Sequence, residues 1–531
     1  MWNIQNNIIE PYQVIRQSIA PLKLSRWQMV KLVVKAVAAD FPTSIWVFIA
    51  SAVFLLTLYL KTRPRVKIPH DLPVVRGRDS HFEDVLKEGR KKYPDTPFLA
   101  KNNRHSFIIF PPKCFDELKR LPEHTASAKA FFHAANYGDW TFIGTETQTL
   151  LKTIIADLTR SMPARVLNRQ QDCRIAFESI IGYCPEWKEF NLLMSTFKIV
   201  AKVNACSFVG RELGTNENWV KAVMMSPLVI HVAVTLMNAC PPLLRPLLSP
   251  LAFLPTMKNQ WDMKRLLTPM IKEDIKTFEA TEDKKELLRP KYEGKIPFTA
   301  MLLSRYKGSQ ASIQQLVEDY ILVSFDSTPS TASALYHVLC ELSIRPEAVD
   351  ILRRELSEIM VDGKLPSTHL QELKRMDSFL RESFRMHPVS LFSLQRVTEK
   401  PVKLSAGPEI PAGAIIGVDA AAINRSPELW ENPDEFDMNR FYNLRQNNGN
   451  ENKFHFLTTG SDSPGWGDGT QACPGRFFAT STIKIALAYI IQHYDIKMRE
   501  GDYPAKMTPL ANGTWAPDTT TTVYLKSRAD I

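Results

Sequence analysis

A single cysteine, Cys473, stands between glycines directly before an apolar helical pattern, in the stretch WGDGTQACPGRFFA at residues 466–479. Glycine carries no Cβ and therefore lets the backbone approach a flat ligand closely. A helix that begins at the cysteine places free N–H groups and its positive dipole end near the sulfur, which lowers the thiol pKa and favours a thiolate. We expect Cys473 to be an axial thiolate ligand, and an axial thiolate pushes electron density onto haem iron and favours O–O cleavage.

Three other interpretations of this loop exist. Cys473 could be a buried structural cysteine, which is the usual role of a single cysteine. The spacing Gly467-x-Gly469-x-x-Ala472 loosely matches a dinucleotide-binding fingerprint, but a strand must precede that motif and the polar run TTGSDSPG precedes this one. A nucleophilic cysteine needs a histidine partner, and none is identifiable nearby. The dinucleotide interpretation is rejected, and the thiolate ligand is favoured over the other two.

The segment from Phe41 to Leu60 contains no charged residue. A helix of this length spans roughly 30 Å, the thickness of the hydrocarbon core of a bilayer. Four basic residues follow it, and such a cluster is typical of the cytoplasmic side: Lys61, Arg63, Arg65 and Lys67. We expect a single transmembrane anchor over 41–60; a buried core helix is the alternative, and a cleaved signal peptide fits poorly because the apolar run begins late.

The remaining chain divides simply. Residues 1–40 form an N-terminal segment that contains either an interfacial helix or a short packed one. Residues 61–73 carry three prolines between basic residues and are expected to be a stiff hinge. Residues 74–531 show no repeat and no second linker, which predicts one large domain.

Helical periodicity dominates that domain, so the predicted fold class is mainly α with small β-sheets. Helices are predicted over 312–344, 347–360 and 368–386, the last one opening with a capping box from Thr368 to Gln371. Short strands are predicted over 402–404, 414–418 and 521–525.

Composition excludes several classes of protein. The seven cysteines include no CxxC pair, so neither a disulfide scaffold nor a zinc site is expected. The net charge of +10 is spread along the chain without a nucleic-acid motif, so no nucleic-acid partner is expected. A basic surface near anionic lipid or an acidic protein partner agrees better with this pattern.

The stretch 466–479 resembles the haem-binding loop of cytochromes P-450, whose usual pattern is F-x-x-G-x-[HR]-x-C-x-G. Trp466, Gly469, Cys473 and Gly475 fall on its aromatic, first glycine, ligand and second glycine positions. Gln471 departs from the basic residue that commonly bonds a haem propionate, so the resemblance implies that this contact is weaker or comes from elsewhere. Family position gives a propionate-binding role to Arg396.

Two further motifs support the resemblance. Glu382 and Arg385 look like the family's E-x-x-R, and 436–441 looks like its F-x-P-x-R-F segment, with Met438 in place of proline. Glu382 and Arg385 lie one turn apart on one helical face, and Arg440 could bridge the glutamate from a loop. The alternative is an ordinary surface ion pair, which would contribute almost nothing to stability.

The stretch 324–329 aligns with the family's [AG]-G-x-[DE]-T-[TS]. Thr328 takes the position whose hydroxyl holds dioxygen and relays protons, while Ser327 stands where the family has an acid. The nearby carboxylate, Asp326, lies one residue earlier and therefore about 100° around the helix. Pro329 has no N–H, so the helix should kink there and open a groove, or simply bend.

The resemblance implies a membrane-anchored monooxygenase that takes electrons from NADPH through a cytochrome P-450 reductase, with haem as its cofactor. Sequence variants such as ACPGRFFA look like biosynthetic enzymes of filamentous fungi, which favours a lipophilic terpenoid or meroterpenoid substrate and a catalytic domain on the cytosolic face of the endoplasmic reticulum. A haem-thiolate isomerase or dehydratase without a reductase is the alternative, and a haem-binding protein without catalysis is a third. Family position assigns the substrate pocket to 131–140, the Phe325 region and the loop near Trp515.

Overall fold

The computed structural model describes residues 68–77, 82–101, 106–288, 296–306, 311–366, 369–499, 501–503, 507–509 and 513–528. The chain divides into two compact units, Met1–Arg65 and Val66–Ile531. Every described residue belongs to the second unit. The predicted N-terminal segment, the predicted anchor and the first half of the predicted hinge lie outside the described residues.

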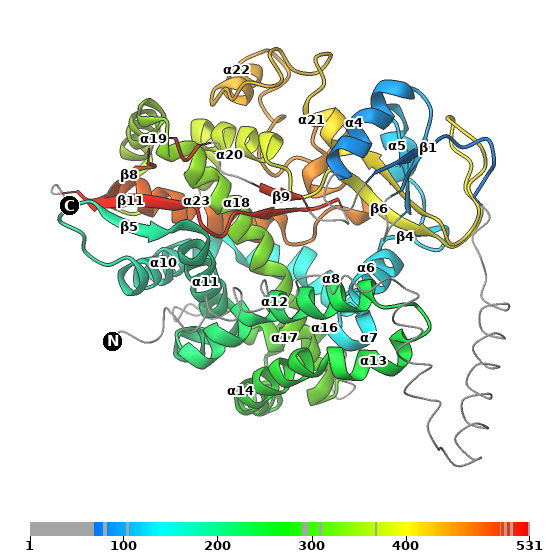
Figure 1. Ribbon diagram of the computed structural model, residues 1–531. Coiled ribbons are helices and arrows are strands. Elements are labelled where there is room, and N and C mark those ends of the chain that lie inside the picture. Colours follow the sequence, from blue (N-terminus) through cyan, green and yellow to red (C-terminus); the bar gives the residue numbers. More distant parts are fainter. Residues whose placement is uncertain are drawn as a thin grey trace, which may run out of the picture. The chain divides into compact units, whose positions relative to one another are not determined.

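Helices form most of the second unit (Figure 1). They are α4 (Phe82–Lys92), α5 (Phe115–Lys119), α6 (Ala128–Asn136), α7 (Gly138–Thr141), α8 (Gln148–Lys152), α9 (Thr159–Ser161), α10 (Val166–Ile180), α11 (Leu192–Gly214), α12 (Glu217–Ala239), α13 (Arg245–Ala252), α14 (Leu254–Ala280), α15 (Lys284–Leu288), α16 (Phe298–Arg305), α17 (Ile313–Ser327), α18 (Pro329–Ser343), α19 (Pro346–Ile359), α20 (Lys374–Met386), α21 (Ala420–Asn424), α22 (Arg440–Arg445) and α23 (Arg476–His493).

Three sheets accompany the helices. The largest has six strands in the order β1-β2-β3-β7-β6-β4, namely β1 (Val74–Arg76), β2 (Phe98–Lys101), β3 (Ser106–Phe110), β7 (Ile415–Asp419), β6 (Phe392–Thr398) and β4 (Ala126–Ser127). A three-stranded antiparallel sheet joins β5 (Lys188–Asn191), β11 (Thr522–Ser527) and β8 (Tyr494–Lys497), and a two-stranded one joins β10 (Trp515–Pro517) and β9 (Met507–Pro509). The fold is therefore mainly α with small sheets.

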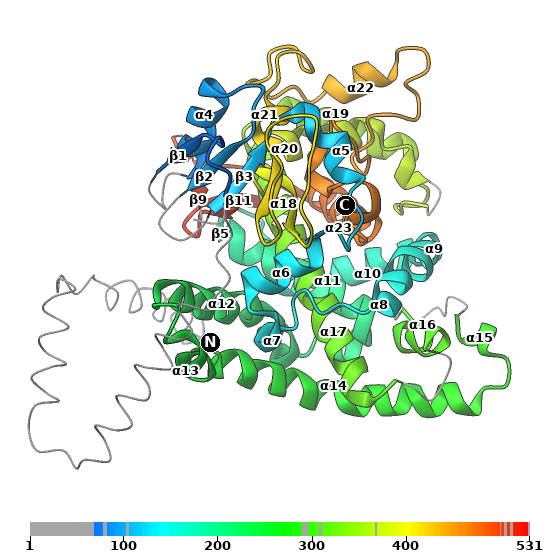
Figure 2. The ribbon, with the colours of Figure 1, turned by 90° about the vertical axis from the view of Figure 1, so that its right-hand side faces the viewer.

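The core is built from helices that are apolar on nearly every side. Helices α11, α18 and α23 bury residues all around their circumference, which is the expected behaviour of a helix without a polar face. They contribute to one large cluster together with α10 and α20. In Figures 1 and 2, α17 and α18 follow one another into this core, and α14 runs along one side of it.

Two described helices, α11 and α12, are long and apolar enough to cross a membrane by length and composition alone. In α11 the most apolar window is 72% buried inside the protein, so α11 is a core helix; in α12 the corresponding share is 39%. Neither helix is the predicted anchor, which lies outside the described residues.

The predicted helix over 312–344 forms as two helices. Helix α17 ends at Ser327, Thr328 has the non-ideal dihedral angles φ −101° and ψ −58°, and α18 begins at Pro329. The break follows from the proline: the carbonyl of Phe325 receives only a long bond of 3.4 Å from the N–H of Thr328. The kink predicted from Pro329 is confirmed.

The predicted start of the helix over 368–386 is wrong. Residues His369–Gln371 form a separate 3₁₀ turn, and α20 begins only at Lys374; Thr368 lies outside the described residues. The cap is supplied by another helix, because the Glu355 carboxylate of α19 accepts the N–H groups of Arg375 (2.6 Å) and Met376 (2.8 Å).

One further predicted helix and two of the three predicted strands are confirmed. The helix over 347–360 corresponds to α19, and the strands over 414–418 and 521–525 correspond to β7 and β11 within one or two residues. The strand over 402–404 is wrong: Val402 makes only an isolated bridge with Ile410. The chain turns between these two residues, so only this one pair of residues forms strand-type hydrogen bonds.

Candidate active site

The loop that carries Cys473 is shaped by its glycines. The N–H of Cys473 donates to the carbonyl of Trp466 over 2.7 Å, which folds the loop back on itself. Gly467 has φ 66°, and a Cβ added there would lie 2.8 Å from the carbonyl oxygen of Gln471, so only glycine suits this turn. At Gly475 an added Cβ meets nothing within 4 Å. Gly475 therefore borders open space beside the cysteine.

The electrostatics of Cys473 differ from the prediction. Burial raises the pKa of the thiol to about 11, and the carboxyl of Asp326 raises it further, while the N–H groups of Gly475 and Arg476 lower it. Desolvation outweighs the helix terminus, so the predicted lowering of the thiol pKa by the protein alone is wrong. An anionic sulfur at this position needs a neighbouring cation, which a metal ion supplies.

The loop is tied to the segment around Lys119. The ammonium group of Lys119 lies 2.9 Å from Asp468, and Asp468 also accepts the hydroxyl of Thr459 (2.9 Å) and the N–H of Gly469 (2.7 Å). These contacts lower the pKa of the Asp468 carboxyl, although burial opposes them. A Cβ at Gly469 would lie 3.2 Å from the carbonyl oxygen of Lys119, so glycine allows this close approach.

Arg396 lies fully buried on β6 beside this segment. Its guanidinium donates to the carbonyls of Leu121 (2.7 Å) and Lys119 (3.3 Å), while its Nε has no hydrogen-bond partner in the described part of the chain. Burial lowers its pKa to about 10. A buried cation with an unused donor is the kind of group that holds an anionic substituent of a ligand.

The residue that departs from the family pattern, Gln471, is engaged elsewhere. Its amide donates to the carboxylate of Glu123 over 2.5 Å, and its buried Oε1 has no partner among the described residues. Trp466 in turn donates its indole N–H to the carbonyl of Phe456 (2.8 Å) and packs on the ring of Phe384 of α20, with centroids 5.0 Å apart. Trp466 thus fixes the cysteine loop to α20.

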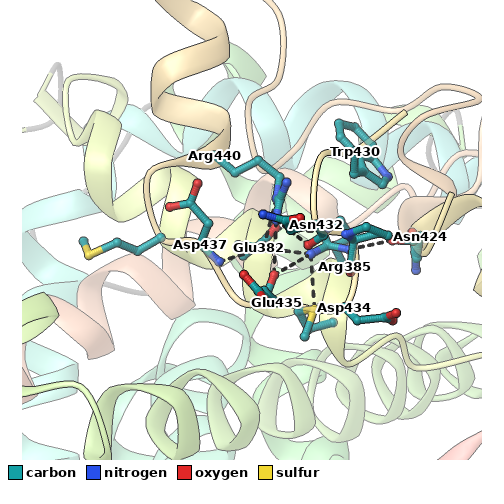
Figure 3. A network of polar contacts seen from close by, with 12 residues as sticks. Glu382, Arg385, Asn424, Trp430, Asn432, Asp434, Glu435, Asp437 and Arg440 are labelled. Atoms are coloured by element: carbon teal, nitrogen blue, oxygen red, sulfur yellow. Dashed lines mark hydrogen bonds and ion pairs between the residues drawn. The ribbon is translucent and has the colours of Figure 1, made fainter. Parts of the chain in front are cut away.

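Glu382, Arg385 and Arg440 form a network of ion pairs and hydrogen bonds (Figure 3). Glu382 is fully buried and accepts two bonds of 2.8 Å from Arg385 and one of 3.1 Å from Arg440. The arginines bind backbone carbonyls with their remaining donors, for example those of Asn424 (2.6 Å) and Asn432 (3.2 Å). The network is buried rather than a surface ion pair, and Arg440 reaches it from the first position of α22 rather than from a loop.

Thr328 lies at the helix break with only 1% of its surface exposed. Its hydroxyl donates to the carbonyl of Ser324 over 2.9 Å, and its own carbonyl accepts the N–H of Ala332 over 2.9 Å. The Ser327 hydroxyl makes a longer bond of 3.5 Å to the same carbonyl of Ser324. The Thr328 hydroxyl therefore satisfies the Ser324 carbonyl, one residue before the Phe325 carbonyl that Pro329 leaves without its usual donor.

Asp326 faces the interior of the protein. Its side chain is exposed, yet burial raises its pKa to about 7 and the nearby Glu146 raises it as well. Exposed surface and strong desolvation occur together where a side chain borders an enclosed space. The same carboxyl raises the pKa of the Cys473 thiol, so Asp326 of α17 is close enough to the cysteine loop to interact with it electrostatically.

Asn204 of α11 is a site residue that no sequence motif indicates. This buried amide donates to the carbonyl of Ser327 over 2.7 Å and accepts the hydroxyl of Thr482 over 3.0 Å. Thr482 belongs to α23, the helix that follows Cys473. Asn204 therefore links the helix break to the cysteine helix, and no local pattern in the sequence indicates such a contact.

The segments expected to line the pocket are only partly brought together. Phe131 of α6 and Trp515 of β10 belong to one cluster around β2, β3 and β6, whereas Phe325 is half-buried near the helix break. Tyr137 and Trp140 pack instead against α12 and Phe253.

Comparison with known proteins decides the family. The family model of cytochrome P-450 matches residues 166–520. The chain belongs to the cytochrome P-450 family. It is 73% identical over 483 residues to cytochrome P-450 monooxygenase ccsD of Aspergillus clavatus, covering 91% of this chain and 98% of that protein. It is 54% identical over 532 residues to pyrichalasin C-18 hydroxylase of Pyricularia grisea, covering 99% of each.

A solved structure agrees on the fold. The retinoic acid bound cyanobacterial CYP120A1 superposes with a TM-score of 0.63 at 15% identity, over 87% of this chain and 100% of that one. The chain is thus a cytochrome P-450 monooxygenase, with haem iron as its cofactor and NADPH as the electron source through a reductase.

The residues present fit a haem. Cys473 offers a desolvated sulfur that needs a cation, Gly475 leaves open space beside it, and Arg396 has a buried donor for a propionate. Bound there, a thiolate-ligated haem supplies the activation of dioxygen.

Removal of the Glu382 carboxylate should be costly, because it strands two buried arginines. We expect Glu382→Ala to lower the free energy of unfolding by about 3–5 kcal/mol and to reduce haem content. Denaturant unfolding and the haem absorption per mole of protein measure both effects. Glu358→Ala, at an exposed position of α19, is the control and should change neither; an unaltered Glu382→Ala protein would contradict the burial argument.

Each of the two hydrogen bonds of Asn204 can be removed separately, the one to the Ser327 carbonyl and the one from the Thr482 hydroxyl. Asn204→Asp keeps an acceptor for Thr482 but loses the donor to the Ser327 carbonyl, whereas Thr482→Val keeps that donor. We expect Asn204→Asp to lose about 1–3 kcal/mol of stability and to divert NADPH electrons to hydrogen peroxide, with Thr482→Val much less affected in peroxide release. Product and peroxide per NADPH are the measurements, and equal coupling in both variants and the parent would refute the link.

Proposed function

We propose that this monooxygenase hydroxylates an unactivated carbon of a lipophilic secondary metabolite related to pyrichalasin. The support is the 54% identity to pyrichalasin C-18 hydroxylase, which extends over 99% of both chains. The terpenoid class favoured by the sequence resemblance has no support of this kind. The observation that carries the proposal is the helix break at Thr328 together with Asp326, whose desolvated carboxyl acts electrostatically on the Cys473 thiol.

In this proposal the distal residues manage protons. The Thr328 hydroxyl, which donates to the Ser324 carbonyl, can turn to donate into the enclosed space, since the break leaves it outside the regular ladder. The Asp326 carboxyl, with a pKa of about 7, holds a proton in about half of the molecules at neutral pH and can pass it toward Thr328. Ser327 contributes its carbonyl to Asn204 and its hydroxyl to the same turn.

The proximal residues hold the ligand in this proposal. Cys473 is the iron ligand, and Gly469, Gly475 and Trp466 shape and fix its loop. Arg396 binds a propionate, and the network of Glu382, Arg385 and Arg440 supports α20, on which Trp466 packs.

The position of Asp326 also bears on the alternative reaction. An isomerase or dehydratase is the alternative because Ser327 replaces the family's acid. In this proposal Asp326 supplies the carboxyl that position 327 lacks, since its carboxyl interacts electrostatically with the Cys473 thiol. The monooxygenase reaction is therefore the function that we propose for this substrate class.

The proposed function is tested with membranes that contain the chain and a fungal NADPH-cytochrome P-450 reductase. We expect a pyrichalasin-type precursor to gain one oxygen atom from isotope-labelled O₂ per NADPH consumed, and we expect no product without NADPH. Product without an electron donor would favour the isomerase or dehydratase, and product that carries oxygen from water would exclude a monooxygenase.

Asp326 predicts a pH dependence. Because its pKa is raised to about 7, the carboxyl is protonated below that pH and loses its proton as the pH rises. Product formed per NADPH should therefore fall between about pH 6 and 8 in the parent, while Asp326→Asn should give a low ratio that is flat over this range. An unchanged pH profile in Asp326→Asn would exclude the residue as the proton donor.

We further propose that the chain is anchored by residues 41–60, that residues 61–73 lead into the catalytic domain over 74–531, and that this domain faces the cytosol at the endoplasmic reticulum. The uncharged segment and its basic flank support the anchor. Exposed apolar side chains on α13 and the start of α14 agree with a membrane-facing surface, namely Leu247 (73% exposed), Leu251 (65%) and Trp261 (59%).

Carbonate extraction of microsomes tests the anchor. A protein held by a spanning helix stays in the membrane pellet at alkaline pH, and we expect the full chain to do so. Added protease should digest the catalytic domain in intact microsomes if that domain is cytosolic. Release of the chain into the carbonate supernatant would contradict a spanning segment.

A further inference from the structure

The cysteine loop lies along a segment that is far from it in the sequence, residues 119–123. The amide nitrogen of Gln471 donates to the Glu123 carboxylate over 2.5 Å. Three residues earlier in the loop, the Asp468 carboxylate pairs with the Lys119 ammonium group over 2.9 Å. Two polar contacts, one at each end, therefore hold the segment 119–123 against the loop.

The same segment binds the guanidinium of Arg396. Arg396 of β6 donates its two terminal nitrogens to the carbonyls of Leu121 (2.7 Å) and Lys119 (3.3 Å), and its Nε has no hydrogen-bond partner in the described part of the chain. The Lys119 carbonyl oxygen also lies against the loop, because a Cβ added at Gly469 would be 3.2 Å from it. The two carbonyls fix the plane of the guanidinium and leave Nε for a ligand.

The two carboxylate oxygens of Glu123 have different partners. One oxygen accepts the amide of Gln471, whereas the other accepts the hydroxyl of Ser127 over 2.5 Å and the N–H of Lys129 over 3.1 Å, at the start of α6. Contacts with the loop and with α6 can therefore be removed one at a time. Glu123 is exposed and Gln471 is half-buried, so substitutions at either position leave the packing of the core unchanged.

The uncharged Gln471 changes how an anionic ligand group is held. An amide does not neutralise a haem propionate, and the amide nitrogen of Gln471 is already bonded to Glu123. Arg396 is the buried cation with an unused donor. The orientation of its guanidinium, which the carbonyls of the segment 119–123 determine, therefore decides how well a propionate is bound.

We propose that Gln471 and Glu123 are positioning residues for haem binding, whose contact holds the segment 119–123 against the cysteine loop and so directs the Arg396 Nε to a haem propionate. The inference rests on the proposed function, which assigns the propionate to Arg396. One structural unit then positions both the iron ligand and the propionate-binding cation. The glutamine thus replaces a direct contact with the propionate by an indirect one.

Transfer of haem from the purified full-length holoenzyme to excess apomyoglobin tests the proposal. Gln471→Leu has a similar size but no donor for Glu123, and we expect it to release haem about fivefold faster, the loss of one net hydrogen bond. The reduction potential of the iron should become more negative, because a displaced guanidinium neutralises less of the propionate charge. Glu123→Ala should have the same two effects. The double variant should be no faster than either single variant, because both remove one contact.

Ser127→Ala is the matched control. It removes a bond to the other oxygen of Glu123 and keeps the contact with Gln471, so haem release and reduction potential should stay at the parent's values. Arg396→Lys keeps the charge but loses the paired bonds to the two carbonyls, and we expect it to release haem faster than the parent.

Four results would overturn the proposal: haem release from Gln471→Leu at the parent's rate, equal acceleration in Ser127→Ala, parent-like release from Arg396→Lys, or multiplied effects in the double variant, which would mean that Gln471 contacts the haem directly. Failure of the proposed function would look different. The parent would then insert no oxygen from O₂ into the pyrichalasin-type precursor, whereas failure of this inference alone leaves that reaction intact.

Discussion

The structure depends on a buried sulfur atom that the protein does not ionise by itself. The surroundings of Cys473 raise its pKa to about 11, because burial outweighs the N–H groups of Gly475 and Arg476. Only a cation at the sulfur makes the thiolate favourable there. The loop is nevertheless held by Lys119, whose carbonyl accepts a bond from Arg396, and by the packing of Trp466. The protein therefore positions the sulfur even though it does not ionise it.

The two sides of the site are mechanically connected. Asn204 binds the Ser327 carbonyl at the helix break and the Thr482 hydroxyl on the helix that follows Cys473. Buried polar groups are rarely without partners, and here one amide satisfies both sides at once. A shift of α23 would therefore be felt at the break that positions Thr328, which relates the proximal ligand to the distal proton chemistry.

Local patterns in the sequence predicted much of this arrangement. The Cys473 loop, the pair Glu382 and Arg385, and the break at Pro329 each depend on residues close together in the chain, and short motifs carry that information. Contacts between distant segments were not predictable. The cap of α20 comes from Glu355 on another helix, Asn204 reaches two further helices, and the desolvation at Cys473 depends on everything packed around it.

The absorption spectrum of the reduced, CO-bound protein tests the central claim most directly. The parent should show the red-shifted Soret band that a thiolate ligand gives, and Cys473→His should keep its haem but lose that band for the one of a nitrogen ligand. A parent without the thiolate band, or a Cys473→His protein that retains it, would contradict ligation of the haem iron through Cys473.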